Sequence, residues 1–161
     1  MEIQLLNSAM FPEDIRKLLR SLYRCGFFSH SLLVGSWIFP IYKETFNIHY
    51  ALKTFDIDFA VDTASWGPLK PIDLEKIFID LGYVPVTDYM TGLRKYSKGG
   101  LEIEFLVPRK GNQDVDHATV KQLNITAIPF PFLNILFQFP LVCRIPRFQG
   151  SDTLPGGFFY P

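Results

Sequence analysis

The sequence predicts an α+β fold, in which a mixed β-sheet has flanking helices on one or both faces. Three observations lead to this class. Apolar residues recur at helical spacing in some segments and alternate with polar residues in others. The two kinds of segment follow one another along the chain. With 161 residues, 48% of them hydrophobic, the chain can bury a core without disulfide or metal staples.

A helix is expected directly after Pro12. Two acidic residues, Glu13 and Asp14, would lie at its positively charged N-terminal end. Leucine and isoleucine then recur every three or four residues, which places them on one face, and Gly26 is the expected stop. This helix therefore presents an apolar face to the core.

A strand, a turn and a second helix are expected next. Residues 31–34 are a short apolar segment, typical of a buried strand, and Gly35 and Ser36 turn the chain into a helix at about residues 37–46. Pro40 is compatible with this helix because it falls near the first turn. Gly35 and Ser36 are therefore expected at the beginning of a helix.

Residues 54–61 have the period of two that is typical of a strand. Apolar residues alternate there with Asp56, Asp58 and Ala60. Aspartate is disfavoured in strands, so two on one face of an apolar segment call for a reason. Both carboxylates are expected to point the same way.

The middle of the chain is predicted to add one helix and three strands. The helix covers residues 71–81 and ends at Gly82. A tight turn at Gly99 and Gly100 joins the last two strands. The strands are expected at residues 83–88, 93–97 and 101–107.

Residues 125–161 differ in composition from the rest of the chain. They hold three charged residues, but seven of the sixteen Phe and six of the twelve Pro. The prolines interrupt the apolar stretch, which argues against a membrane-spanning helix, and one short helix is expected near residues 132–139. The domain prediction is therefore a main domain at residues 1–124 and an extension at residues 125–161 that packs on this domain or on a partner subunit.

Composition also limits the class of protein. Sixteen basic residues balance sixteen acidic ones, which disfavours long duplex nucleic acid as a partner. The N-terminus lacks the pattern of a secretory signal, and two cysteines fit a cytoplasmic protein. Aromatic residues at 156–161 without a capping helix indicate either a shortened chain or a tail that docks on a second subunit, in a homo-oligomer or on a partner protein.

Carboxylates on two predicted strands give the strongest functional signal. Glu102 and Glu104 alternate with apolar residues, as Asp56 and Asp58 do on the earlier strand. Residues two apart on a strand lie about 7 Å apart, and neighbouring strands lie about 4.8 Å apart. Two aspartates and one glutamate can therefore converge on a small volume, where their repulsion calls for cations such as Mg²⁺.

The turn at Gly35 and Ser36 supplies a second part of such a site. Backbone N–H groups at the beginning of a helix bind phosphate, glycine allows a close approach, and serine adds a hydroxyl. An acidic group that binds metal ions beside a phosphate cradle suits nucleotidyl transfer.

Together these residues resemble the polymerase-β-like nucleotidyltransferase superfamily. Its pattern is an apolar residue with Gly-Gly or Gly-Ser, then two acids alternating with apolar residues, then a third acid on a following strand. The matching segments are Val34-Gly35-Ser36, residues 55–59 and Ile103-Glu104-Phe105. The segment 53–58 looks especially like small prokaryotic nucleotidyltransferase-like proteins, a group that includes toxin–antitoxin members. The resemblance covers about residues 13–107 and implies a nucleotidyltransferase-like fold.

The resemblance also implies a metal site. Asp56, Asp58 and Glu104 would bind Mg²⁺, with Mn²⁺ as a substitute, and Glu104 would help to deprotonate the acceptor. Glu102 also fits the third acidic position. Gly-Ser lies twenty residues before Asp56, which requires a long helix or an extra turn through residues 47–52.

The substrate prediction follows from the same resemblance. Gly35 and Ser36 would bind the β and γ phosphates of an NTP, and Arg94 and Lys95 are candidates for further nucleotide contacts. The predicted reaction moves a nucleoside monophosphate to a hydroxyl acceptor, and protein, RNA and small molecules all remain open as acceptors. The alternative is a weakly active nucleotidyltransferase-like binding module, such as one component of a toxin–antitoxin pair.

Overall fold

The computed structural model describes residues 2–4, 10–51, 54–65, 70–111, 116–138, 140–144 and 157–159. In residues 2–4, 141–144 and 157–159 only the backbone is described. The helices are α1 (Glu13–Arg24), η2 (Phe27–Ser29), η3 (Gly35–Ile38), α2 (Phe39–Phe46), α3 (Leu74–Asp80), η4 (Lys121–Leu123) and η5 (Leu133–Gln138), where η marks a 3₁₀ helix. The strands are β1 (Glu2–Gln4), β2 (Ser31–Val34), β3 (Asp56–Val61), β4 (Val84–Thr87), β5 (Arg94–Lys98), β6 (Leu101–Pro108), β7 (Ala118–Val120), β8 (Ile125–Phe130), β9 (Leu141–Arg144) and β10 (Gly157–Phe159).

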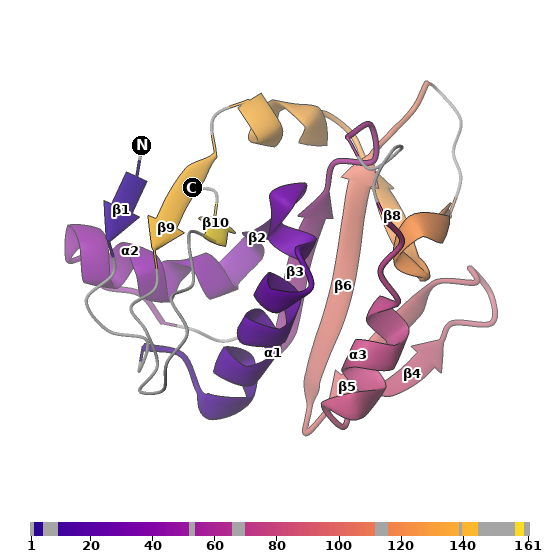
Figure 1. Ribbon diagram of the computed structural model, residues 1–161, viewed down its shortest axis with the longest axis horizontal. Coiled ribbons are helices and arrows are strands. Elements are labelled where there is room, and N and C mark those ends of the chain that lie inside the picture. Colours follow the sequence, from indigo (N-terminus) through magenta and orange to yellow (C-terminus); the bar gives the residue numbers. More distant parts are fainter. Residues whose placement is uncertain are drawn as a thin grey trace.

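In the described part of the chain, ten strands form one mixed sheet, which confirms the predicted α+β class (Figure 1). Its order is β1-β9-β10-β2-β3-β6-β5-β4, and β8 branches from β6 and pairs with β7. β3 lies between β2, which runs antiparallel to it, and β6, which runs parallel. β6 changes neighbours along its length, because β5 pairs with its beginning and β8 with its end.

The main core lies between one face of this sheet and helices α1 and α3. The side chains of Ile15, Leu18 and Leu22 on α1 are fully buried, as the apolar stripe predicts. They belong to one apolar cluster with Phe59 on β3 and Phe105 on β6, whose rings stack 5.9 Å apart. In Figure 1 both helices lie in front of the central strands. Burial of this stripe therefore fixes α1 across the strands that carry the acidic residues.

The opposite face of the central strands is apolar at one end and acidic at the other. Leu133 of η5 packs there with Val34 and Ala60 in a second buried cluster. Asp56 and Asp58 lie on the same face of β3 as Ala60, because side chains alternate between the two faces of a strand. The candidate site thus lies where the two parallel strands begin, and η5 packs toward their other end.

Most of the predicted elements are confirmed by the structure. α1, β2, α2, β3, α3 and β4 form within the expected segments, and β5 and β6 each extend one residue beyond theirs. Gly99 and Gly100 both adopt positive φ in the turn between β5 and β6. α2 ends at Asn47, whose φ is 54°, and the expected extra turn through residues 47–52 falls partly outside the described residues, which stop at 51 and resume at 54.

The prediction for the segment after residue 117 was incomplete. The expected short helix is present as η5, but β7, β8 and β9 also form there. In β8, Ile125, Ala127 and Pro129 are buried in alternation, which is a strand pattern despite the proline. β8 pairs with β6, so the sheet continues beyond residue 124, and the proposed boundary there stays a prediction.

Two expectations about the remainder of the chain have different outcomes. Among the described residues, no helix is long and apolar enough to cross a membrane. The expected docking of residues 156–161 on a second subunit concerns side chains that lie outside the described residues.

Candidate active site

Strand register brings the acidic residues and the Gly-Ser turn to one place. In the parallel β3–β6 pair, Asp56 lies beside Glu102 and Asp58 beside Glu104. In the antiparallel β2–β3 pair, Val34 lies beside Asp58. Because the chain turns directly after Val34, Gly35 enters the site next to Asp58.

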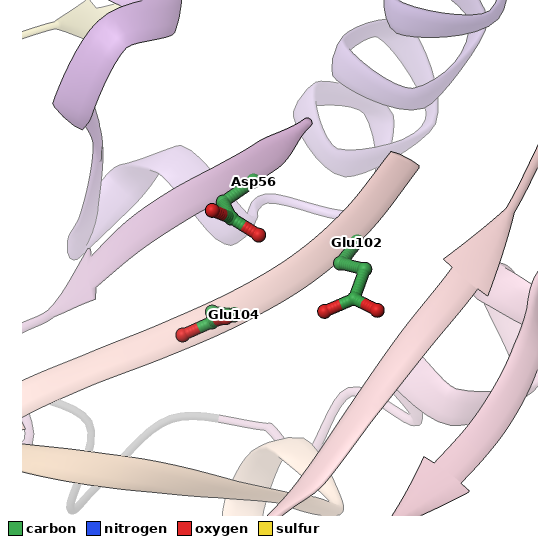
Figure 2. Close-up of side chains that lie close together, drawn as sticks. All are labelled: Asp56, Glu102 and Glu104. Carbon is green, nitrogen blue, oxygen red and sulfur yellow. The ribbon is translucent and has the colours of Figure 1, made fainter. Parts of the chain in front are cut away.

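Three carboxylates form a compact group. Asp56, Glu102 and Glu104 each offer an oxygen, and these oxygens all lie within 4.8 Å of one another. Figure 2 shows their origin, with Asp56 on β3 and the two glutamates on β6. Carboxylate oxygens are the ligands that Mg²⁺ and Mn²⁺ prefer, and such ions lower the repulsion among the acids. The donor set therefore fits a divalent cation.

Asp58 lies beside this group and is partly buried. The pKa of its carboxyl is raised to about 6, chiefly by burial and then by the neighbouring charges of Glu104 and Asp56, against an opposing effect of Lys95. A cation bound nearby would stabilise the ionised form of this carboxyl group.

The raised pKa of Asp58 gives a testable pH dependence. The folded chain binds a proton at Asp58 more tightly than the unfolded chain does, so stability falls as pH rises from about 4 to about 6. Asp58→Asn removes this loss. In metal-free buffer we expect urea unfolding to show Asp58→Asn more stable than the wild type above about pH 6, with the difference shrinking toward about pH 4. A difference that stays constant over this range would contradict the assignment.

Glycine is required at position 35 for two reasons. Its φ of +69° is a conformation that side chains disfavour. A Cβ built on Gly35 would also lie only 2.3 Å from Oδ2 of Asp58. The backbone therefore approaches the carboxylate more closely than any other residue would allow.

Ser36 and the residues after it differ slightly from the predicted helix. Gly35 and Ser36 begin the 3₁₀ helix η3, and the regular helix α2 starts only at Phe39. Pro40 falls in the first turn of α2, as predicted. The Gly-Ser turn thus leads into α2 through one intervening 3₁₀ segment.

Lys95 on β5 lies against the two glutamates. Its Nζ lies 2.6 Å from Oε1 of Glu104 and 3.4 Å from Oε2 of Glu102. The side chain of Glu104 is 15% exposed and that of Glu102 is 40% exposed. The pKa of Lys95 is raised, mainly by its hydrogen bond to Glu104, and the ammonium group therefore stays charged.

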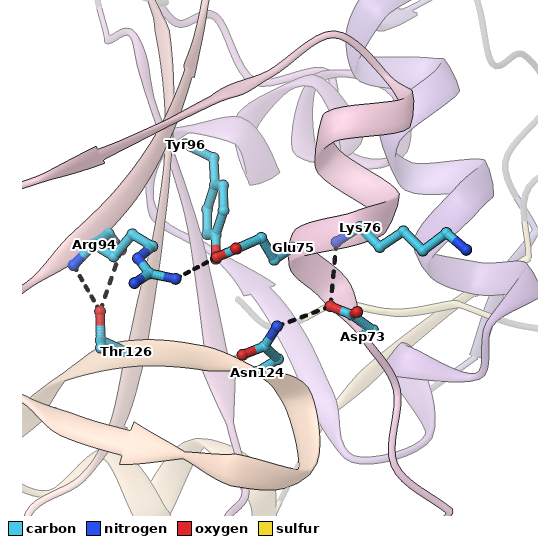
Figure 3. A network of polar contacts seen from close by, with 7 residues as sticks. All are labelled: Asp73, Glu75, Lys76, Arg94, Tyr96, Asn124 and Thr126. Carbon is cyan, nitrogen blue, oxygen red and sulfur yellow. Dashed lines mark hydrogen bonds and ion pairs between the residues drawn. The ribbon is translucent and has the colours of Figure 1, made fainter.

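Arg94, in contrast, is not brought to the carboxylates. Adjacent residues of a strand point to opposite faces, so Arg94 lies on the side of α3. Its guanidinium pairs with Glu75 of α3, and its backbone N–H donates to Oγ1 of Thr126 at 2.6 Å (Figure 3). The same network continues to Tyr96, whose hydroxyl lies 3.1 Å from Oε2 of Glu75. Arg94 therefore ties β5 to α3 and β8.

This network gives a prediction for stability. Tyr96→Phe removes one buried hydrogen bond to Glu75, while the pairing of Glu75 with Arg94 remains. We expect the free energy of unfolding in urea to fall by about 1 kcal/mol. Glu75→Ala should cost more, because it leaves the buried Tyr96 hydroxyl without its acceptor. Equal losses in the two variants would contradict this network.

Comparison with known proteins adds the family. Neither the curated proteins nor the solved structures give a match. A family model described as nucleotidyltransferase matches residues 13–150, which is more than half of the chain. The match includes the Gly-Ser turn, β3 and β6 with their carboxylates. The chain therefore belongs to this nucleotidyltransferase family.

Proposed function

We propose that this protein transfers a nucleoside monophosphate from an NTP to a hydroxyl acceptor and depends on a divalent cation. The observation that carries the proposal is the close approach of Gly35 to Asp58 beside the carboxylates of Asp56 and Glu104. The turn that would bind phosphate and the carboxylates that would bind a cation are thereby adjacent, as transfer from a nucleoside triphosphate requires.

Each carboxylate has a place in this proposal. Asp56, Asp58 and Glu104 would hold Mg²⁺ or Mn²⁺, which when bound neutralises the charge that develops on the phosphates. Glu104 is preferred to Glu102 as the third ligand because it lies beside Asp58 in register and is less exposed. Glu102 is the alternative, since its oxygen belongs to the same compact group.

In this proposal, groups of the protein bind the triphosphate and take the proton from the acceptor. Backbone N–H groups at Gly35 and Ser36 would bind the β and γ phosphates and orient the triphosphate. The acceptor oxygen forms a bond to the α phosphorus, the bond from that phosphorus to the bridging oxygen breaks, and pyrophosphate leaves. Glu104 would take the proton of the acceptor hydroxyl.

The test uses an NTP labelled at its α phosphate. The purified chain is incubated with Mg²⁺, each NTP in turn, and protein, RNA or small hydroxyl compounds as acceptors. We expect label on one acceptor class with equal release of pyrophosphate, and neither without the metal. Release of pyrophosphate that needs no acceptor would indicate a phosphohydrolase and contradict the proposal.

A parallel binding measurement separates an enzyme from a binding module. A site for metal and nucleotide should raise the melting temperature when both are added. Stabilisation without transfer to any acceptor would favour the weakly active module, for example within a toxin–antitoxin pair. Without stabilisation or transfer, the site assignment would be wrong.

A further inference from the structure

Lys95 occupies a position in the acidic group that the proposed function alone does not explain. Its Nζ contacts Oε1 of Glu104 at 2.6 Å and lies within 3.4 Å of Glu102. Its side chain is 33% exposed, so the ion pairs are partly shielded from water. An ammonium group that contacts two carboxylates lowers the repulsion between them, as a bound metal ion would.

The neighbouring lysine on the same strand shows that this placement is specific to position 95. Lys98 points to the other face of the sheet, where its Nζ contacts Asp14 of α1 at 2.9 Å. Both lysines are about equally exposed, at 33% and 32%. Of these two lysines, Lys95 is therefore the one that alters the charge of the acidic group at short range.

We infer that Lys95 is a positioning residue that holds Glu104 and Glu102 when no metal is bound and competes with the divalent cation for Glu104. The inference rests on the proposed metal site. A carboxylate oxygen that accepts a hydrogen bond from an ammonium is less available to a metal ion, and the ammonium charge also repels that ion. Lys95 thus sets the metal affinity of the free protein to a lower value than the carboxylates alone would give.

Glu102 has a defined part in this exchange. It is already within reach of Lys95, it is the more exposed of the two glutamates, and it lies beside Asp56 rather than Asp58. When Glu104 turns to the metal, Glu102 remains as the partner of the ammonium. The two glutamates therefore divide the roles of metal ligand and lysine partner.

Binding of Mn²⁺ in the absence of nucleotide and acceptor tests the inference. Free Mn²⁺ is followed by electron paramagnetic resonance for the full chain and three variants. We expect Lys95→Met to bind Mn²⁺ about fivefold or more tightly than the wild type, because a positive charge is lost beside the site. Lys95→Arg, which keeps the charge, and Lys98→Met, the matched control on the same strand, should bind as the wild type does. Equal or weaker binding by Lys95→Met would overturn the inference.

A second measurement follows the wild-type chain and does not depend on the folding of Lys95→Met. The ¹⁵N signal of the Lys95 ammonium, assigned by its loss in Lys95→Arg, is followed during titration with Mg²⁺. We expect it to move as Glu104 is released, while the Lys98 signal stays in place. A Lys95 signal that is unchanged at saturating Mg²⁺ would overturn the inference.

The outcome is separate from that of the proposed function. If neither the wild type nor Lys95→Met binds Mn²⁺, the inference is wrong, while label transfer from the NTP still decides the proposed reaction. If both bind Mn²⁺ with the expected difference and no transfer occurs, the inference stands and the transfer proposal fails.

Discussion

The double variant Asp56→Asn, Asp58→Asn is expected to lose nucleotidyl transfer almost completely, by about 1000-fold or more. Both side chains lie on the same face of β3, and amides are poor substitutes for the carboxylates that bind a divalent cation. The fold should persist, because the change relieves repulsion among Asp56, Asp58 and Glu104. The rate of label transfer and the midpoint of urea unfolding measure the two effects.

An exposed aspartate on α3 provides the control for this double variant. Asp80→Asn makes the same chemical change away from the acidic group and should leave the transfer rate unchanged. Transfer at the wild-type rate by Asp56→Asn, Asp58→Asn would exclude the proposed mechanism. Loss of the unfolding transition would instead assign these carboxylates a structural role.

The second large effect is expected for Gly35→Ala. The new methyl group would lie 2.3 Å from Oδ2 of Asp58, so the carboxylate or the turn must move. A misplacement of about 1 Å at a catalytic group costs about 100-fold in rate. The positive φ of this residue adds a loss of about 1–2 kcal/mol in the free energy of unfolding. Transfer rate and urea unfolding are both measured.

Gly26→Ala is the matched control for the backbone part of this effect. Gly26 also has a positive φ, of +82°, but apart from its two chain neighbours no described residue has a heavy atom within 4 Å of a Cβ built there. We expect Gly26→Ala to lose stability to a similar degree and to keep its transfer rate. A Gly35→Ala variant that transfers as fast as Gly26→Ala would show that the approach to Asp58 is not needed for the reaction.

The acidic face of the sheet could be predicted from the sequence because it depends on local alternation. Asp56 and Asp58 are two residues apart on one strand, and so are Glu102 and Glu104, so each pair shares a face wherever the strand lies. The sequence left the register between β3 and β6 open. Pairing of Asp58 with Glu104 joins distant segments, and only the folded sheet shows it.

The strands after residue 117 could not be predicted because two local signals conflict there. Ile125 and Ala127 alternate with polar or half-buried residues as a strand requires, but Pro129 lacks the N–H group of a regular ladder. Among the described strands, β8 pairs with β7 over its first half and with β6 over its second, so Pro129 has a partner strand on one side. Tertiary pairing thus permits a strand that propensity disfavours.

The grouping of Arg94 with Lys95 as nucleotide contacts shows a different limit. Arg94 and Lys95 are grouped because both are basic residues near one hairpin. Side chains alternate along β5, however, so the two lie on opposite faces of the sheet. The predicted strand at residues 93–97 contained this signal. The binding of nucleotide by Lys95 stays a prediction, and the structure places Arg94 in the network with Glu75.

The order of strands in the sheet has a consequence for the newly made chain. β10 pairs with β2 and β9, so this side of the sheet is complete only after the last described residues are synthesised. The strands of the candidate site, from β2 to β6, are all made earlier. Since domains can begin to fold during synthesis, the acids on β3 and β6 are expected to meet while the ribosome is still adding the later strands. The hairpin of β5 and β6 then delivers Lys95 together with Glu102 and Glu104, so the nascent chain brings its own counter-charge to the acids.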